Sequence, residues 1–120
     1  MTADDPVEDD EVSVELYVEL VLQCAESVPR GRATTYGAIA DVVGERLGRG
    51  GPRQVGAVMA RHGGGVPWWR VVRADGSLPE SHRAEARMAH LEEGTPLRAG
   101  GGVDLRAAFA APRLRGADAG

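Results

Sequence analysis

The chain has 120 residues, a length typical of one domain, and 42% of them are hydrophobic. No apolar run approaches the roughly 18 residues that a membrane-spanning helix needs. The acidic N-terminus lacks the basic and apolar regions of a secretory signal, so a cytoplasmic protein without membrane contact is expected. The single cysteine, Cys24, excludes an intramolecular disulfide. The three histidines show no metal-ligand spacing, so neither a metal nor another cofactor is expected.

The net charge of -4 conceals two regions of opposite sign. Residues 1–20 contain eight acidic residues and no basic one, whereas the remaining hundred residues carry a net charge of +4. The excess of positive charge is largest between Arg30 and Arg73, a segment that contains eight arginines and only two acidic residues, Asp41 and Glu45. A local basic surface on an acidic chain is typical of a nucleic-acid-binding protein, because phosphate contacts supply most of the affinity. An arginine-rich solvated face without a ligand is the alternative.

The first half of the chain predicts three helices. Residues 1–10 are expected to form a disordered acidic tail, and residues 11–115 one folded domain. Residues 12–28 predict a helix that Pro29 ends, with Cys24 as a small buried hydrophobic residue. Thr35 is a good N-cap for a helix over 36–43, which Gly44 closes, and Pro52 favours the start of a helix over 52–62. Two such helices indicate a helix-turn-helix, although the expected loop is longer than the usual three or four residues.

The second half predicts less regular structure. Residues 66–72 are expected to form a short buried β element, and residues 81–93 a helix that Gly94 caps. Its apolar residues Ala84, Met88 and Leu91 are expected to face inward, and His82 and His90 to lie on the surface. In the tail, Leu97 and residues 103–105 allow a short strand pair. The expected fold is mainly α, a winged-helix-like helix-turn-helix domain with a minor β element.

Four segments in this order carry a resemblance to a known family. They are VPRGRATTYGAIADVVG, PRQVGAVM, VPWWRVVRADGSL and LEEG. Together they cover roughly residues 12–97, and they resemble the C-terminal DNA-binding domain of O6-alkylguanine-DNA alkyltransferases. Each piece alone is common, but the combination of P-x-G-x-x-x-T-Y-G, R-Q-V-G and P-x-x-R-V-V is specific.

The active-site motif of that family, Pro-Cys-His-Arg-Val, stands here as Pro67-Trp68-Trp69-Arg70-Val71. Alkyl transfer needs a thiolate, and Trp68 at the cysteine position supplies no nucleophile. Trp69 replaces the histidine that would take the thiol proton. Glu93 of LEEG matches the carboxylate that orients that histidine, and it is expected to keep a structural role by pairing with Arg70. A tryptophan at the cysteine position is the mark of the alkyltransferase-like proteins, although these usually keep the histidine.

The resemblance implies a base-flipping mechanism in the minor groove of double-stranded DNA. Arg53 would fill the space that the flipped base leaves, and Tyr36 would crowd the 3′ phosphate. By residue type alone, Arg53 could instead be an ordinary exposed side chain and Tyr36 a packing residue. Trp68 would line the lesion pocket and Trp69 would be partly structural, with Pro67, Arg70 and Arg83 beside them. The residue that senses the alkyl group stays open among Ser81, His82 and Arg83. Arg32, Thr35 and Arg61 are candidate phosphate contacts.

The expected function is a monomeric sensor of O6-alkylguanine that flags the lesion for nucleotide excision repair proteins. Two other functions compete with it. An alkyltransferase with a different nucleophile is disfavoured, because Cys24 is the only cysteine and lies on another helix. A winged-helix regulator without lesion recognition would read bases in the major groove as a dimer, and Arg53 with Gln54 suits such contacts. A preference for damaged DNA separates the sensor from the regulator.

Overall fold

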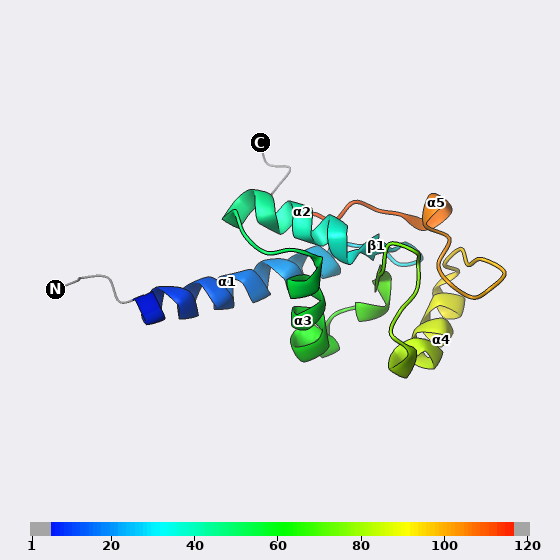
Figure 1. The fold of residues 1–120 in the computed structure, drawn as a ribbon. Helices are drawn as coiled ribbons and strands as arrows, with labels where there is room; N and C mark the ends of the chain where they lie inside the picture. Colours follow the sequence, from blue (N-terminus) through cyan, green and yellow to red (C-terminus); the bar gives the residue numbers. More distant parts are fainter. Residues whose placement is uncertain (1–5, 117–120) are drawn as a thin grey trace.

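The computed structural model describes residues 6–116, with side chains from residue 13 onward (Figure 1). Three helices at the N-terminal end pack on one another, and a smaller region with the fourth helix follows. A pair of two-residue strands lies between these parts. Within the described residues, no helix is long and apolar enough to cross a membrane. The elements in chain order are α1 Pro6–Glu26, β1 Thr34–Thr35, α2 Tyr36–Leu47, α3 Pro52–His62, β2 Val71–Val72, α4 Arg83–Glu93 and α5 Leu105–Ala108, with short 3-10 helices at Gly63–Gly65, Trp68–Arg70 and Glu80–His82.

Helix α1 begins at Pro6, six residues before the predicted start. Proline is tolerated in the first turn because its missing N–H would have no partner there. Residues 6–10 are therefore helical, which corrects the expected disordered tail, while residues 1–5 lie outside the described part of the chain. The C-terminal half of α1 buries one stripe of side chains, and Cys24 belongs to it, as predicted. The buried residues of this stripe are Tyr17, Leu20, Val21, Cys24 and Ala25, and Val28 just beyond the helix is buried as well.

Helix α2 is longer than its sequence predicted. The Thr35 hydroxyl oxygen accepts a hydrogen bond from the Ala38 N–H (3.0 Å), which confirms the predicted cap. The helix does not stop at Gly44 but continues to Leu47, and Gly48 ends it with a φ of 73°. Glycine suits this left-handed conformation because it has no Cβ. The connection to α3 is therefore four residues long, the usual length for a helix-turn-helix.

Helix α3 occupies the predicted residues 52–62. Pro52 lies in its first turn, and the Gln54 side chain accepts a hydrogen bond from the Gly51 N–H (2.9 Å). Its buried face packs against α1 and α2 and completes the larger hydrophobic core. These contacts leave the opposite face of α3 exposed, which is the face a helix-turn-helix would present to DNA. The core residues that α2 and α3 contribute are Ile39, Ala40, Val43, Val55, Val58 and Met59.

The minor β element is a parallel pairing of β1 with β2, in which Thr34 lies opposite Val71. It joins residues far apart in sequence and sets the Trp68–Arg70 turn beside the start of α2. Helix α4 packs near this turn, but it buries a different face from the predicted one. Met88 and Leu91 are 71% and 61% exposed, whereas Ala86 and His90 are buried. The small Ala86 lets the helix approach a second, smaller hydrophobic core closely, and this contact decides which face is buried. The residues of this second core are Ala33, Val72, Leu78, Ala86, Val103 and Ala108.

The C-terminal residues turn back across the whole domain. Leu97 and Val103 pair as an antiparallel bridge, as predicted, and they flank what we call the 97–103 hairpin. Leu105 does not extend that pairing, because it begins the short helix α5. Ala33 then pairs with Phe109, and Leu114 is buried in the larger core. The last described residues therefore connect both cores.

Candidate DNA lesion-binding site

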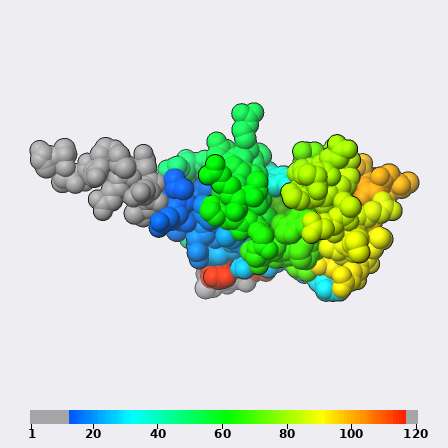
Figure 2. Space-filling view, turned by 90° about the horizontal axis from the view of Figure 1, so that it is seen from below, coloured from blue at the N-terminus to red at the C-terminus, as the bar shows by residue number. Residues whose placement is uncertain are grey.

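A cavity of about 410 Å³ lies between α3 and the segment that leads into α4. We call it the α3–α4 cavity. Figure 2 shows α3 in green and the start of α4 in yellow-green on the same face of the molecule. The volume falls in the range of roughly 300–1,000 Å³ that small-ligand sites occupy. The lining is mixed: apolar and aromatic residues predominate, and three polar residues stand along one edge. Tyr36, Met59, Trp68, Leu78 and Pro79 form the apolar wall, Ser81, His82 and Glu85 the polar edge, and Gly56, Ala60, Gly63 and Gly64 the remainder.

Trp68 is the central aromatic residue of this cavity. Its ring packs against the larger core on one side and lies 5.6 Å from the His82 ring, centroid to centroid. Tyr36 approaches from the first turn of α2 and lines the same space. Burial raises the pKa of the Tyr36 hydroxyl, although the nearby Arg73 charge opposes this effect. The Trp68 ring and the neutral Tyr36 phenol therefore border a cavity that is open to solvent. Such a lining suits a flat, partly apolar ligand.

The second tryptophan belongs to a different arrangement, centred on Glu93. The Trp69 indole N–H donates to Glu93 Oε2 (2.8 Å), and the Arg70 guanidinium binds both carboxylate oxygens at 3.1 and 2.7 Å. The Gly31 N–H donates to Oε1 (3.0 Å). The predicted pairing of Glu93 with Arg70 is confirmed. Trp69, which stands at the position of the family's histidine, is a further hydrogen-bond donor to Glu93 that the sequence did not predict.

These donors determine the charge state of Glu93. Burial alone raises the pKa of a carboxyl group, but the hydrogen bonds from Arg70, Gly31 and Trp69 outweigh it and lower the Glu93 pKa to about 2. The side chain is only 3% exposed. Glu93 is therefore a buried, paired carboxylate at neutral pH. It ties α4 to the Trp68–Arg70 turn and to the loop before β1, so it positions the cavity wall.

His90 supports the same turn from α4. Its Nε2 atom lies 2.7 Å from the Trp69 carbonyl oxygen, and the ring is buried. The prediction of a surface position is therefore wrong for His90, whereas His82 is exposed as predicted. Helix α4 reaches the turn only through the folded arrangement of residues distant in sequence. Spacing along the chain alone could not reveal this contact.

Cys24 is chemically inert in this structure. Its side chain is fully buried on α1, and burial raises the pKa of the thiol to about 11. A buried neutral thiol is a poor nucleophile, because the thiolate is the reactive form. Cys24 is not among the residues that line the α3–α4 cavity. The one cysteine of the chain therefore offers no acceptor for alkyl transfer there.

The arginines predicted to contact DNA differ in whether their side chains already bond to other parts of the chain. Arg53 at the start of α3 and Arg61 near its end are exposed. Arg32 is occupied, because its Nε and Nη2 atoms donate to the carbonyls of Ala108 and Phe109 at 2.9 and 2.7 Å. It holds the C-terminal segment through these bonds, and the residue is exposed. Thr35 caps α2 and stands beside Tyr36.

Of the five predicted pocket residues, only Trp68 lines the α3–α4 cavity. Trp69 and Arg70 contact Glu93, and Pro67 begins the turn by accepting a hydrogen bond from the Arg70 N–H (3.0 Å). Arg83 donates to the Leu78 carbonyl (3.2 Å) and lines a different cleft. Ser81 and His82, two of the three residues left open as sensors of the alkyl group, line the cavity. Sequence reasoning missed Met59, although it ends the segment PRQVGAVM, and Glu85, which belongs to none of the four segments.

Comparisons with known proteins agree with this geometry. Residues 17–94 match the family described as the DNA-binding domain of 6-O-methylguanine DNA methyltransferase. The chain therefore belongs to that family, and its relatives place it among the alkyltransferase-like proteins. Proteins of Escherichia coli (strain K12) and Shigella flexneri, both named DNA base-flipping protein, are each 34% identical to it over 96 residues. The match spans 75% of this chain and 70% of theirs.

Two solved structures have the same fold. One is S. pombe Atl1 in complex with damaged DNA containing O6-carboxymethylguanine, with a TM-score of 0.67 and 25% identity. It covers 82% of this chain and 97% of the other. The second is the S. pombe protein in complex with DNA, with a TM-score of 0.64 and 27% identity, covering 82% and 96%. The helical architecture with a minor β element is thereby confirmed.

Proposed function

We propose that this protein is a non-enzymatic DNA damage sensor that binds and flips O6-alkylguanine. The observation that carries the proposal is the position of Trp68. It occupies the cysteine position of the family motif and lines the α3–α4 cavity next to the DNA-facing helix. The cavity therefore keeps an aromatic wall for a flipped base at the position where the transferases keep their nucleophile.

The lack of a nucleophile supports binding without turnover. Trp68 and Trp69 carry no group that can accept an alkyl cation, and the Cys24 thiol is buried and protonated. The relatives named DNA base-flipping protein carry a name that specifies no transfer reaction. The protein holds the lesion and leaves the alkyl group on the base.

Base flipping needs a group to replace the base in the stack and contacts that hold the base outside it. Arg53 is exposed at the start of α3 and takes the first role, entering from the minor groove. Tyr36 turns the nucleotide at its 3′ phosphate, with Thr35 beside it, and Arg61 contacts the backbone farther along α3. Ser81 and His82 meet the alkyl group at the polar edge of the cavity.

Such a sensor stays bound at the lesion, and the bound protein marks that site on the DNA. A bound protein that does not repair the lesion must hand it to another system, and nucleotide excision repair acts on bulky, distorted sites. We place the protein in the cytoplasm, on the nucleoid when it is bound to DNA, acting as a monomer. The DNA partner of the S. pombe relative supports the first step of this sequence.

The test is a fluorescence anisotropy titration with two duplexes that differ only by one O6-methylguanine, at one fixed salt concentration. We expect at least tenfold tighter binding to the modified duplex. Trp68→Ala should abolish this preference while leaving binding to unmodified DNA, and Arg53→Ala should weaken binding to both. Arg106→Ala, which removes an equal charge from exposed α5, is the matched control and should change neither.

Mass spectrometry of the protein after incubation with the modified duplex should show no added alkyl group. An added methyl group would contradict the absence of transfer. Equal affinity for the two duplexes would overturn lesion sensing and favour a DNA-binding regulator without lesion specificity.

A further inference from the structure

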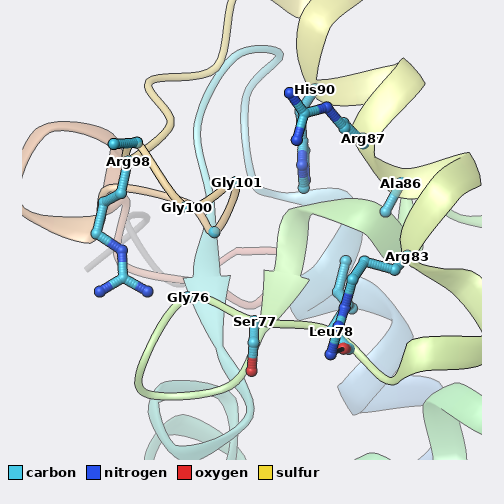
Figure 3. A pocket seen from close by; sticks show the side chains of 12 residues that line it. Gly76, Ser77, Leu78, Arg83, Ala86, Arg87, His90, Arg98, Gly100 and Gly101 are labelled. Carbon is cyan, nitrogen blue, oxygen red and sulfur yellow. Dashed lines mark hydrogen bonds between the residues drawn. The ribbon is translucent and has the colours of Figure 1, made fainter.

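A second cleft, of about 570 Å³, lies on the other side of α4 from the α3–α4 cavity. We call it the arginine cleft. Figure 3 shows its three walls: the turn from Gly76 to Leu78, one face of α4 and the 97–103 hairpin. Leu78 is the only residue that lines both this cleft and the α3–α4 cavity. Nothing in the lesion-sensing mechanism uses the arginine cleft.

The charges of this cleft have one sign. Arg83 and Arg87 come from α4, and Arg98 comes from the hairpin on the opposite wall (Figure 3). None of the residues that line the cleft is acidic. Arg83 and Arg87 are four residues apart on α4, a like-charge spacing that disfavours the helix. The positions three and four residues from Arg87 along α4 also hold no acidic residue. Arg83 donates one hydrogen bond to the Leu78 carbonyl, and Arg98 donates one to the Asp75 carbonyl and lies near the Asp75 carboxylate. The positive charge of the cleft is therefore least compensated at Arg87, which has no acidic neighbour among the lining residues.

The backbone of the 97–103 hairpin lies close to the guanidinium groups of Arg87 and Arg98. A Cβ atom at Gly101 would lie 2.9 Å from Arg87 Nη1, and one at Gly102 would lie 2.9 Å from Arg98 Nη2. Both distances are so short that a Cβ atom at either position would displace the end of that arginine side chain. Gly101 also has a φ of 103°, which disfavours any residue with a side chain. Glycine at these positions therefore lets both guanidinium groups lie directly against the hairpin backbone.

We propose that the arginine cleft binds an acidic segment of a partner protein. A planar guanidinium binds a carboxylate through two parallel hydrogen bonds, and three of them suit several carboxylates along one peptide. Leu78, Ala86 and Ala99 supply apolar surface for aliphatic side chains between the acids. The lining contains no Phe, Tyr or Trp on which a nucleic-acid base could stack, and its one aromatic ring, that of His90, is buried and bonded to the Trp69 carbonyl, which disfavours a nucleotide.

The cleft is connected to the lesion-binding side through two contacts. The Arg83 guanidinium donates to the carbonyl of Leu78, which lines both spaces, and His90 holds the Trp69 carbonyl next to Trp68. A base in the α3–α4 cavity that shifts either contact would alter the cleft. This coupling rests on the proposed function, whereas the docking itself does not. A partner could therefore distinguish the loaded sensor from the free one.

The test uses the full chain and a fluorescein-labelled decapeptide that alternates Asp or Glu with Leu, measured by anisotropy without DNA. We expect binding that weakens with salt and that falls at least tenfold in Arg87→Gln and in Arg98→Gln. Arg46→Gln, with the same loss of charge on α2, is the matched control and should bind normally. Gly101→Ala should also weaken binding, because it displaces Arg87 without removing a charge. Circular dichroism verifies that each variant is folded.

Several outcomes would overturn the proposal. They are no binding of the acidic peptide, equal binding of a peptide with Asn and Gln in place of the acids, or an equal loss in Arg46→Gln. Displacement of the peptide by an unmodified duplex in the Arg53→Ala variant would assign the cleft to DNA phosphates instead. A final titration adds the duplex with O6-methylguanine to the wild type. A changed peptide affinity supports the coupling, and an unchanged affinity removes the coupling while leaving the docking.

Discussion

Glu93 shows how a single residue can keep its structural role after the chemistry around it has changed. In this protein the carboxylate accepts hydrogen bonds from the neighbouring residues Trp69 and Arg70 and from Gly31, which lies in a distant part of the chain. Because the side chain is 3% exposed, each of these bonds acts in an environment with little screening. The position of the Trp68–Arg70 turn therefore depends on one charge.

Glu93→Gln should lower the free energy of unfolding by about 3 kcal/mol, because it leaves the Arg70 charge without a counter-charge in a mostly buried site. Urea denaturation at pH 7 measures this loss. Glu92→Gln changes the neighbouring exposed carboxylate and should have an effect below about 0.5 kcal/mol. Similar losses in the two variants would show that the network around Glu93 contributes nothing specific.

The pH dependence of stability follows from the same residue. The Glu93 pKa of about 2 lies below its ordinary value of 4.5, so the charged carboxylate favours the folded state. Its contribution is complete above pH 4.5 and is lost as the pH falls toward 2, by roughly 3 kcal/mol. The difference in stability between wild type and Glu93→Gln should therefore shrink over this range. A difference that stays constant down to pH 2 would contradict the low pKa.

At the scale of elements, the first turn of α2 positions Tyr36. The Thr35 hydroxyl caps this helix, while the Thr35 backbone belongs to β1 and lies opposite Val72. One residue thus ends a strand and begins a helix, and it determines the direction in which Tyr36 leaves the sheet. Local chemistry is sufficient for this arrangement, which is why the cap could be predicted from sequence.

Thr35→Ala should lower stability by about 1 kcal/mol through loss of the cap. It should also weaken DNA binding, because the first turn of α2 frays and Tyr36 loses its position. Thr35→Ser keeps the hydroxyl and is the matched control. Thermal unfolding and the anisotropy titration measure the two effects. An alanine variant with the stability of the serine variant would show that the cap is not needed to hold this turn.

At the scale of the whole molecule, the C-terminal segment connects the two hydrophobic cores. Arg32 holds it through the carbonyls of Ala108 and Phe109, and Leu114 enters the larger core beside α1. This segment carries little regular structure, so its order depends on these contacts. The described domain is therefore stabilised from its end as well as from its helices.

Leu114→Ala should cost about 2–3 kcal/mol, because it leaves a cavity in a packed core. Leu91→Ala makes the same change on α4, where the side chain is 61% exposed, and should be nearly neutral. Chemical denaturation of both variants provides the comparison. Equal losses would mean that Leu114 is not packed in the core in solution.

Much of the fold could be predicted because it depends on neighbours in sequence. The cap at Thr35, the proline at the start of α3 and the loss of the cysteine at Trp68 are all readable in short motifs. The end of α2 was misplaced because glycine weakens a helix without always ending it. There, packing of the last turn against the core outweighs the propensity of Gly44.

The sequence by itself determined the family, the order of the helices and the absence of a nucleophile at the motif, because each of these is written in local residue types. Only the tertiary structure decided which arginines are free. Arg32 donates to carbonyls distant in sequence, whereas Arg53 remains exposed. It also decided that His90 is buried and Leu91 exposed. Burial and pairing are properties of contacts between distant segments, and the folded chain alone specifies those contacts.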